Sequence, residues 1–96
     1  LLVILTGVDA VYLDYNTAHQ RALSTLGVLE ARQYLREGQF PPGSMGPKIQ
    51  AAIDFLEGGA GEALITSPER LHDALLGRAG TWITARQQVD GHKQVA

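Results

Sequence analysis

The sequence predicts an α/β fold, because apolar runs typical of strands alternate with segments of helical periodicity. Three runs read as strands: residues 1–6 (LLVILT), 62–66 (EALIT) and 80–85 (GTWITA). Apolar residues recur every three or four positions in residues 26–37 and 45–57, which predicts two helices. Three strands make a small sheet with an unpaired edge, so we expect the 96-residue chain to be cut from a longer protein.

The first strand leads into a segment of mixed character. Residues 1–6 are continuously apolar, which suits a strand that is buried on both faces, as in a mainly parallel sheet. Gly7 lets the backbone turn, and residues 9–15 (DAVYLDY) combine aromatic and β-branched residues with acids. This composition predicts an extended excursion or a short hairpin. Residues 16–24 are polar and predict a loop.

Two longer helices follow, each with signals at its ends. Gly38 ends the predicted helix over residues 26–37. Ser44 is positioned to cap residues 45–57 with its side chain, and Pro47 is tolerated in the first turn because its missing N–H would be unpaired there. Gly58 and Gly59 end this second helix.

A third, shorter helix is predicted between the second and third strands. The segment Ser67-Pro68-Glu69 combines a hydroxyl cap, a proline at the first position and an early acid. The buried stripe of this helix is expected at Leu71, Ala74 and Leu75, with a stop at Gly77. We place the domain at residues 1–85 and expect residues 86–96 to form a polar tail.

Composition excludes several classes of function. The net charge is −2 and no basic run occurs, so nothing predicts binding to nucleic acid. The longest fully apolar run, Leu1 to Leu5, is far shorter than the roughly 20 residues of a membrane helix. Without cysteine there is no disulfide or thiolate site, which fits a cytoplasmic protein. His19, His72 and His92 are scattered, so we predict no metal site.

The segment most suggestive of chemistry is residues 40–48 (FPPGSMGPK). Two glycines flank a serine at a helix start, where backbone N–H groups converge and the helix dipole favours an anion. Lys48 adds a positive charge in the first turn, which suits a phosphate. The alternative is an ordinary helix start beside a solvated lysine, and the pattern is not that of the phosphate loop.

The same segment resembles the signature of the carbamate kinases, in which a Gln-Phe or His-Phe pair precedes Gly-Ser-Met-Gly-Pro-Lys. Residues 49–56 (IQAAIDFL) resemble the next helix of that family, and residues 5–12 (LTGVDAVY) are similar to its Leu-Thr-Asp-Val-Asp-x-Val-Tyr. Residues 76–81 (LGRAGT) resemble its closing Gly-x-x-Gly-Thr. Gly7 departs from the usual Asp and Ala10 from a frequent Gly, so a carboxylate contact to the nucleotide is weakened.

The resemblance implies a three-layer α/β/α sandwich of the amino acid kinase family, present in part. It implies reversible phosphoryl transfer between ATP and carbamate with Mg²⁺ bound through the nucleotide, commonly during arginine breakdown. Lys48 would stabilise charge on the transferring phosphoryl group. The implied nucleotide-binding residues are Thr6, Gly7, Val8, Asp9, Tyr12, Gly43, Ser44, Met45, Gly46, Pro47 and Lys48.

Other roles stay open for several of these residues. Asp9 could instead order the turn after the first strand, and Tyr12 could be a packed strand aromatic. Met45 lies on the apolar helix face, so core packing is favoured over ligand contact. Trp82 is expected in the core.

The carbamate side of the family's site has no counterpart in this sequence. We therefore expect the isolated chain to be inactive, and the full-length form to be a cytoplasmic homodimer that acts on carbamate or carbamoyl phosphate. The alternatives are an inactive remnant, a nucleotide-binding module without turnover, or another amino acid kinase that acts on glutamate, acetylglutamate, aspartate or UMP.

Overall fold

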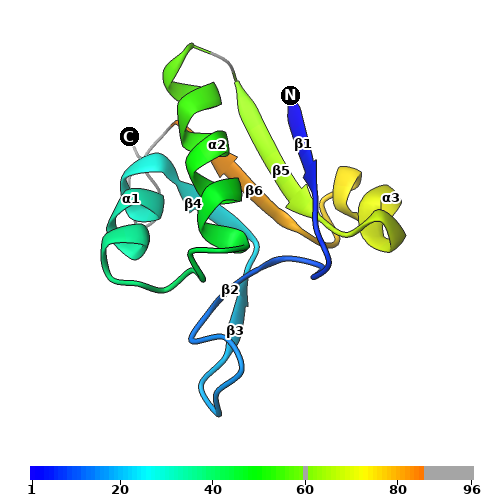
Figure 1. Cartoon of the computed structure of the whole chain (residues 1–96). Helices are drawn as coiled ribbons and strands as arrows, with labels where there is room; N and C mark the ends of the chain where they lie inside the picture. Colours follow the sequence, from blue (N-terminus) through cyan, green and yellow to red (C-terminus); the bar gives the residue numbers. More distant parts are fainter. Residues whose placement is uncertain (60, 86–96) are drawn as a thin grey trace, which may run out of the picture.

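The computed structural model describes residues 1–59 and 61–85, which form a four-stranded sheet, a separate hairpin and three helices (Figure 1). The strands of the sheet, in spatial order, are β1 (Leu2–Leu5), β5 (Glu62–Thr66), β6 (Thr81–Thr84) and β4 (Thr25–Gly27). The hairpin consists of β2 (Val11–Leu13) and β3 (Arg21–Leu23). The helices are α1 (Val28–Arg36), α2 (Met45–Glu57) and α3 (Leu71–Leu75), and a 3-10 turn, η1 (Pro68–Arg70), precedes α3.

The sheet is mainly parallel, as predicted. β1 pairs with β5 in parallel and β4 with β6 in parallel, whereas β5 and β6 are antiparallel. The ends of β1 and β5 therefore lie at the same edge of the sheet as the starts of β6 and β4. The predicted tail over residues 86–96 lies outside the described residues.

Helices cover both faces of the sheet. α2 packs on β1 and β5, and α1 packs on α2 and β4. Ile83 of β6 lies in the core cluster with Ile49 and Ile53 of α2. Because neighbouring strand residues point to opposite faces, Trp82 faces the other way, where its indole N–H donates to the Ala74 carbonyl of α3 at 3.1 Å. The predicted three-layer arrangement is thus present, and Trp82 is half-buried between the sheet and α3.

The first strand is not buried on both faces, which corrects the prediction. β1 is an edge strand, and α2 covers only the face with Leu2 and Ile4. The alternate side chains are exposed: Leu1 by 62%, Val3 by 37% and Leu5 by 45%. A continuously apolar run therefore marks a strand here without marking a buried one.

Two short strands were not predicted. Residues 16–24 were expected to form a loop, but Arg21–Leu23 pairs with Val11–Leu13 to complete the hairpin. Thr25–Gly27 forms β4, so Leu26 is a buried strand residue instead of the start of a helix. Strands of three residues are too short to show the two-residue periodicity by which a strand is recognised.

The helix ends agree largely with the prediction. α2 spans Met45–Glu57, and Gly38, Gly58 and Gly77 follow the three helices. Leu75 was expected in the buried stripe of α3 but is 49% exposed, because a helix of five residues buries little beyond Ala74.

Two buried threonine hydroxyls attach the hairpin to the sheet. Thr81 at the start of β6 accepts the Val11 N–H at 2.8 Å and donates to the Leu23 carbonyl at 2.5 Å. Thr66 at the end of β5 donates to the Asp9 carbonyl at 3.1 Å. Both threonines are fully buried. An isolated hairpin is marginally stable, so these bonds determine where it lies.

Replacing Thr81 with Val should therefore destabilise the fold. The new side chain has the same shape but leaves the Val11 N–H and the Leu23 carbonyl without this partner, which costs about 2–4 kcal/mol of the free energy of unfolding. Urea denaturation of the chain measures the loss. Thr25→Val, at an exposed position of β4, is the control and should change stability by less than about 0.5 kcal/mol. Equal effects of the two substitutions would contradict this role of Thr81.

Two constraints favour glycine at position 80, just before β6. Its φ of +73° is disfavoured for other residues, and a Cβ there would lie 3.0 Å from the Ile65 carbonyl oxygen. Gly77 has a similar φ of +81° but open space around the Cβ position. We expect Gly77→Ala to lower the free energy of unfolding by about 1–2 kcal/mol, from backbone strain alone. Gly80→Ala should cost clearly more in the same denaturation experiment, and equal costs would show that the close contact is harmless.

Candidate nucleotide-binding cleft

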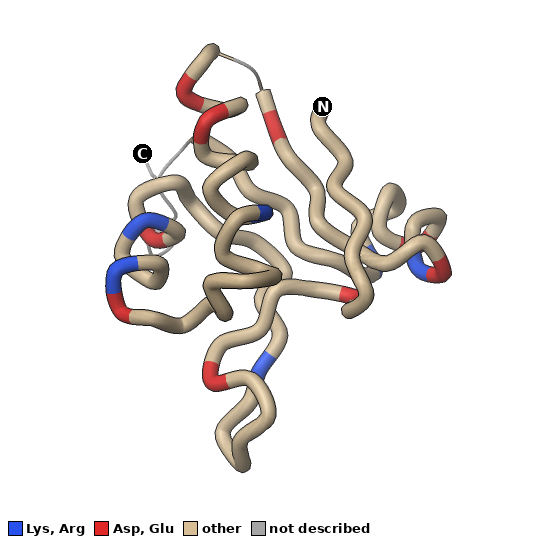
Figure 2. The backbone as a smooth tube through the Cα atoms, viewed as in Figure 1, with Lys and Arg blue, Asp and Glu red and all other residues tan. Residues whose placement is uncertain are grey.

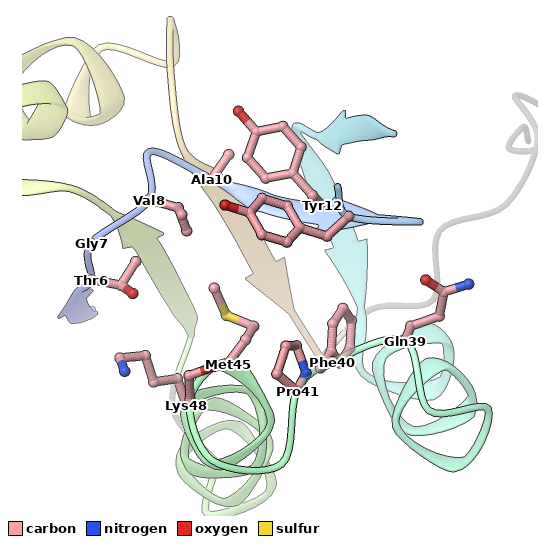
Figure 3. A pocket seen from close by; sticks show the side chains of 12 residues that line it. Thr6, Gly7, Val8, Ala10, Tyr12, Gln39, Phe40, Pro41, Met45 and Lys48 are labelled. Atoms are coloured by element: carbon pink, nitrogen blue, oxygen red, sulfur yellow. The ribbon is translucent and has the colours of Figure 1, made fainter. Parts of the chain in front are cut away.

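A cavity of about 360 Å³ lies where β1 ends and α2 begins (Figure 3). α2 turns into β5 through Gly58 and Gly59, so it runs antiparallel to β5 and brings its first turn to the edge where β1 and β5 end. This edge of an α/β sheet is where ligands bind most often. The cavity is lined by Thr6, Gly7, Val8, Ala10, Tyr12, Tyr15, Gln39, Phe40, Pro41, Ser44, Met45 and Lys48.

Two tyrosines of the hairpin form one wall of the cavity. The rings of Tyr12 and Tyr15 are 5.7 Å apart between centroids and inclined by 51°. The Tyr12 hydroxyl donates to the Asp9 carboxylate at 2.6 Å. This hydrogen bond raises the pKa of Tyr12 above its ordinary value, and partial burial and the charge of Asp9 raise it further. The wall thus offers flat apolar surface with a polar edge.

The segment before α2 and its first turn form the opposite wall. Phe40 is 4% exposed and packs edge-to-face on Tyr34 of α1, with the ring centroids 6.3 Å apart. The Pro41 carbonyl accepts the N–H groups of Ser44 at 3.2 Å and of Gly46 at 2.9 Å. Gly46 permits this approach, because a Cβ there would lie only 3.1 Å from the Pro41 oxygen.

These bonds correct part of the predicted phosphate site. The N–H groups of Ser44 and Gly46 were expected to converge on an anion, but both already have Pro41 as their acceptor. Ser44 does take the N-cap position of α2, yet its hydroxyl makes no capping hydrogen bond within the described chain. These two N–H groups are therefore not available to an anion, and Lys48 supplies the side-chain positive charge on this wall.

Lys48 is the one cation among the described residues that line the cavity. It is half-buried, and Figure 3 shows its side chain extending along the cavity toward Thr6. No ion pair involves it within residues 1–59 and 61–85. Figure 2 shows Lys and Arg positions interspersed with Asp and Glu positions over residues 1–59 and 61–85. An unpaired lysine beside an apolar cavity suits a ligand with a flat apolar part and an anionic part.

The structure brings together most of the predicted site residues. Seven of them line the cavity: Thr6, Gly7, Val8, Tyr12, Ser44, Met45 and Lys48. Asp9 lines an adjoining hollow with Ser67 and Glu69 instead. Gly43, Gly46 and Pro47 do not line the cavity, and Gly46 acts through the backbone contact described above. Met45 packs in the core cluster, as favoured from the sequence, and one side of it also borders the cavity.

Five residues of the lining were not predicted: Ala10, Tyr15, Gln39, Phe40 and Pro41. Gln39, Phe40 and Pro41 stand within or next to the motif that carried the resemblance, so extending the site four residues upstream of Gly43 would have included them. Tyr15 follows Tyr12 by three positions, but nothing in the sequence shows that the chain folds back there.

The described residues hold no group of three or more His, Asp or Glu side chains suited to a metal ion. His92 lies outside the described residues. None of the described helices is long and apolar enough to cross a membrane.

The ionisation of Tyr12 tests the geometry of this wall. In an absorbance titration, one tyrosine should ionise at higher pH than the others, and Asp9→Asn should lower its pKa because the negative charge is removed. Tyr12→Phe should abolish this late titration. The folded pKa lies above the unfolded one, so stability should fall as the pH rises from the ordinary tyrosine pKa through the folded value. A Tyr12 that ionises at the ordinary tyrosine pKa, or whose titration is unchanged in Asp9→Asn, would contradict the hydrogen bond to Asp9.

Comparison with known proteins identifies the family. Residues 1–67 match the sequence profile of the amino acid kinase family. The chain is 46% identical to the carbamate kinase of Oenococcus oeni over 84 residues, and 50% identical to that of Thermoplasma acidophilum over 82 residues. These matches cover 88% and 85% of the chain, but 27% of each relative.

Solved structures agree. A carbamate kinase from Giardia lamblia bound to AMP-PNP superposes with a TM-score of 0.80 at 37% identity, over 86% of this chain and 26% of that one. A protein from Aeropyrum pernix superposes with a TM-score of 0.78 at 45% identity, over 88% of this chain and 27% of that one. The chain therefore spans about a quarter of the length of its relatives, and it belongs to the amino acid kinase family.

Proposed function

We propose that this chain supplies the nucleotide side of a carbamate kinase active site, in a protein that transfers a phosphoryl group between ATP and carbamate. The observation that carries the proposal is the half-buried Lys48, which has no ion-pair partner among residues 1–59 and 61–85, beside an apolar cavity at the ends of β1 and β5. Relatives named carbamate kinase, one of them bound to AMP-PNP, support the choice of ligand.

The two walls of the cavity suit the two parts of a nucleotide. Tyr12 and Tyr15 offer aromatic surface for a base. Lys48 lies on the opposite wall, where it would meet the terminal phosphates. Because phosphoryl transfer gains most from positioned positive charge, Lys48 would act mainly on the transferring group. Mg²⁺ would arrive bound to the nucleotide, where it neutralises phosphate charge.

The acceptor side of the reaction would lie in the part of the protein that corresponds to the rest of the relatives. Carbamate needs its own positioning groups, and the chain spans only 27% of the length of the carbamate kinase from Oenococcus oeni. We therefore expect no turnover from the isolated chain. The same observation favours a second candidate, a nucleotide-binding module without turnover.

Other amino acid kinases are a weaker alternative. Kinases of glutamate, acetylglutamate, aspartate or UMP share a glycine-rich helix start followed by lysine, but the sequence Gly-Ser-Met-Gly-Pro-Lys over residues 43–48 resembles the carbamate kinases instead.

A chimaera supplies the missing parts and tests the proposal. Residues 1–85 replace the matching segment of the carbamate kinase from Oenococcus oeni, and ATP formation from carbamoyl phosphate and ADP is measured. Lys48→Ala should lower kcat by about 10²–10³-fold and change the KM for ADP much less, because its charge acts in the transition state. Arg36→Ala, at an exposed position of α1, is the control and should leave both constants unchanged.

Two results would decide against the proposal. An unchanged kcat in Lys48→Ala would remove the role of this lysine. A chimaera without activity, combined with calorimetric binding of ADP to the isolated chain, would favour the module without turnover.

A further inference from the structure

One pair of hydrogen bonds joins the lining of the cavity to the loop of the hairpin. The side-chain oxygen of Gln39 accepts the backbone N–H of Asp14 at 2.8 Å, and its amide N–H donates to the Asp14 carboxylate at 3.1 Å. The two residues are 25 positions apart in the sequence. Gln39 lines the cavity, as do Tyr12 and Tyr15. In the sequence, Asp14 stands between these two tyrosines. We call this pair the Gln39–Asp14 latch.

The two sides of the latch differ in how firmly they are held. Gln39 follows α1 directly, and its N–H donates to the Tyr34 carbonyl at 3.0 Å, while Gly38 ends the helix with a φ of +79°. Its backbone is therefore part of the helical layer. Asp14 stands at the end of β2 with a φ of +51°, in the loop of a hairpin whose strands are three residues long. The threonine bonds hold the base of this hairpin, but Asp14 lies beyond them.

We infer that Gln39 is a positioning residue, which holds the tyrosine-bearing end of the hairpin against the segment leading into α2 and thereby sets the width of the cavity mouth. The inference rests on the proposed function only where it concerns the nucleotide. A glutamine is suited to this task because one side-chain amide both accepts and donates, so it satisfies the N–H and the carboxylate of Asp14 together.

Replacing the amide with a carboxylate tests the latch. In Gln39→Glu, two carboxylates face each other at neutral pH, and one of the two bonds loses its donor. Repulsion raises the pKa of one of the pair, so the latch should be open above that pKa and close as the pH falls through it. Glu37 and Tyr15 also border this site, and Lys48 lies across the cavity. These groups therefore contribute to the pH dependence of latch opening.

A reciprocal exchange keeps both bonds with the groups swapped. In Asp14→Asn combined with Gln39→Glu, the new amide at position 14 donates to the new carboxylate, which still accepts the N–H of residue 14. Asparagine also tolerates the positive φ at this position. The control is Gln50→Glu, which makes the same change in an equivalent pair, because the Gln50 amide donates to Asp54 at 3.0 Å on α2, and Gln50 does not line the cavity.

Hydrogen exchange at the Asp14 amide detects the latch in the absence of any ligand. With rates corrected for the intrinsic effect of pH, Gln39→Glu should speed exchange at the Asp14 amide about tenfold at neutral pH, as expected for the loss of a hydrogen bond. The double variant and lower pH should both restore the original rate. If the Asp14 amide hydrogen exchanges at the same rate in Gln39→Glu and in Gln50→Glu, the latch does not exist in solution and the inference is overturned.

Calorimetry with ADP and Mg²⁺ on the same chains separates the latch from the nucleotide. We expect Gln39→Glu to weaken ADP binding about tenfold at neutral pH, with recovery in the double variant. Unchanged affinity despite faster exchange would overturn the positioning role. If the original chain binds no ADP, the proposed function fails, while the exchange data still decide whether the latch forms.

Discussion

The buried hydroxyl of Thr81 is the contact on which the cleft depends. Through this hydroxyl the sheet binds the hairpin, which has little stability of its own. The sheet itself is formed by distant parts of the chain. One oxygen both accepts and donates, so the bases of β2 and β3 are attached to the start of β6 together. Without this attachment, the tyrosine wall would be positioned relative to α2 mainly by the Thr66 bond and the Gln39–Asp14 latch.

The cleft is thus assembled from parts of unequal rigidity. α2 and the Phe40 segment belong to the core, since Ile49, Ile53 and Phe40 are buried with the sheet. The hairpin stands outside that core and is held through a few polar contacts. Such a division, with a rigid wall carrying the charge and a less stable wall carrying the aromatic rings, lets a ligand be enclosed without unfolding the layer that binds its charged end.

Much of this architecture could be predicted from the sequence, and the limits are physical. α2 and β5 have the predicted bounds because their apolar spacing and flanking glycines are local signals. β3 and β4 could not be recognised, since three residues show no periodicity, and the partner of β4, β6, lies far along the chain. The site was predicted through a motif, and two of its residues, Lys48 and Met45, line the cavity. The same motif could not show that the Pro41 carbonyl accepts the N–H groups of Ser44 and Gly46, because that contact depends on the backbone path.

The open side of β1 has a consequence for handling the protein. One edge of this strand has no partner in the described sheet, and Leu1, Val3 and Leu5 present apolar surface beside it. Unprotected edges of this kind are templates for strand addition between molecules. Aggregation at high protein concentration should therefore depend on these three side chains more than on the net charge of −2. Natural sheets discourage such strand addition with a lysine on the edge strand, which Val3→Lys would supply here.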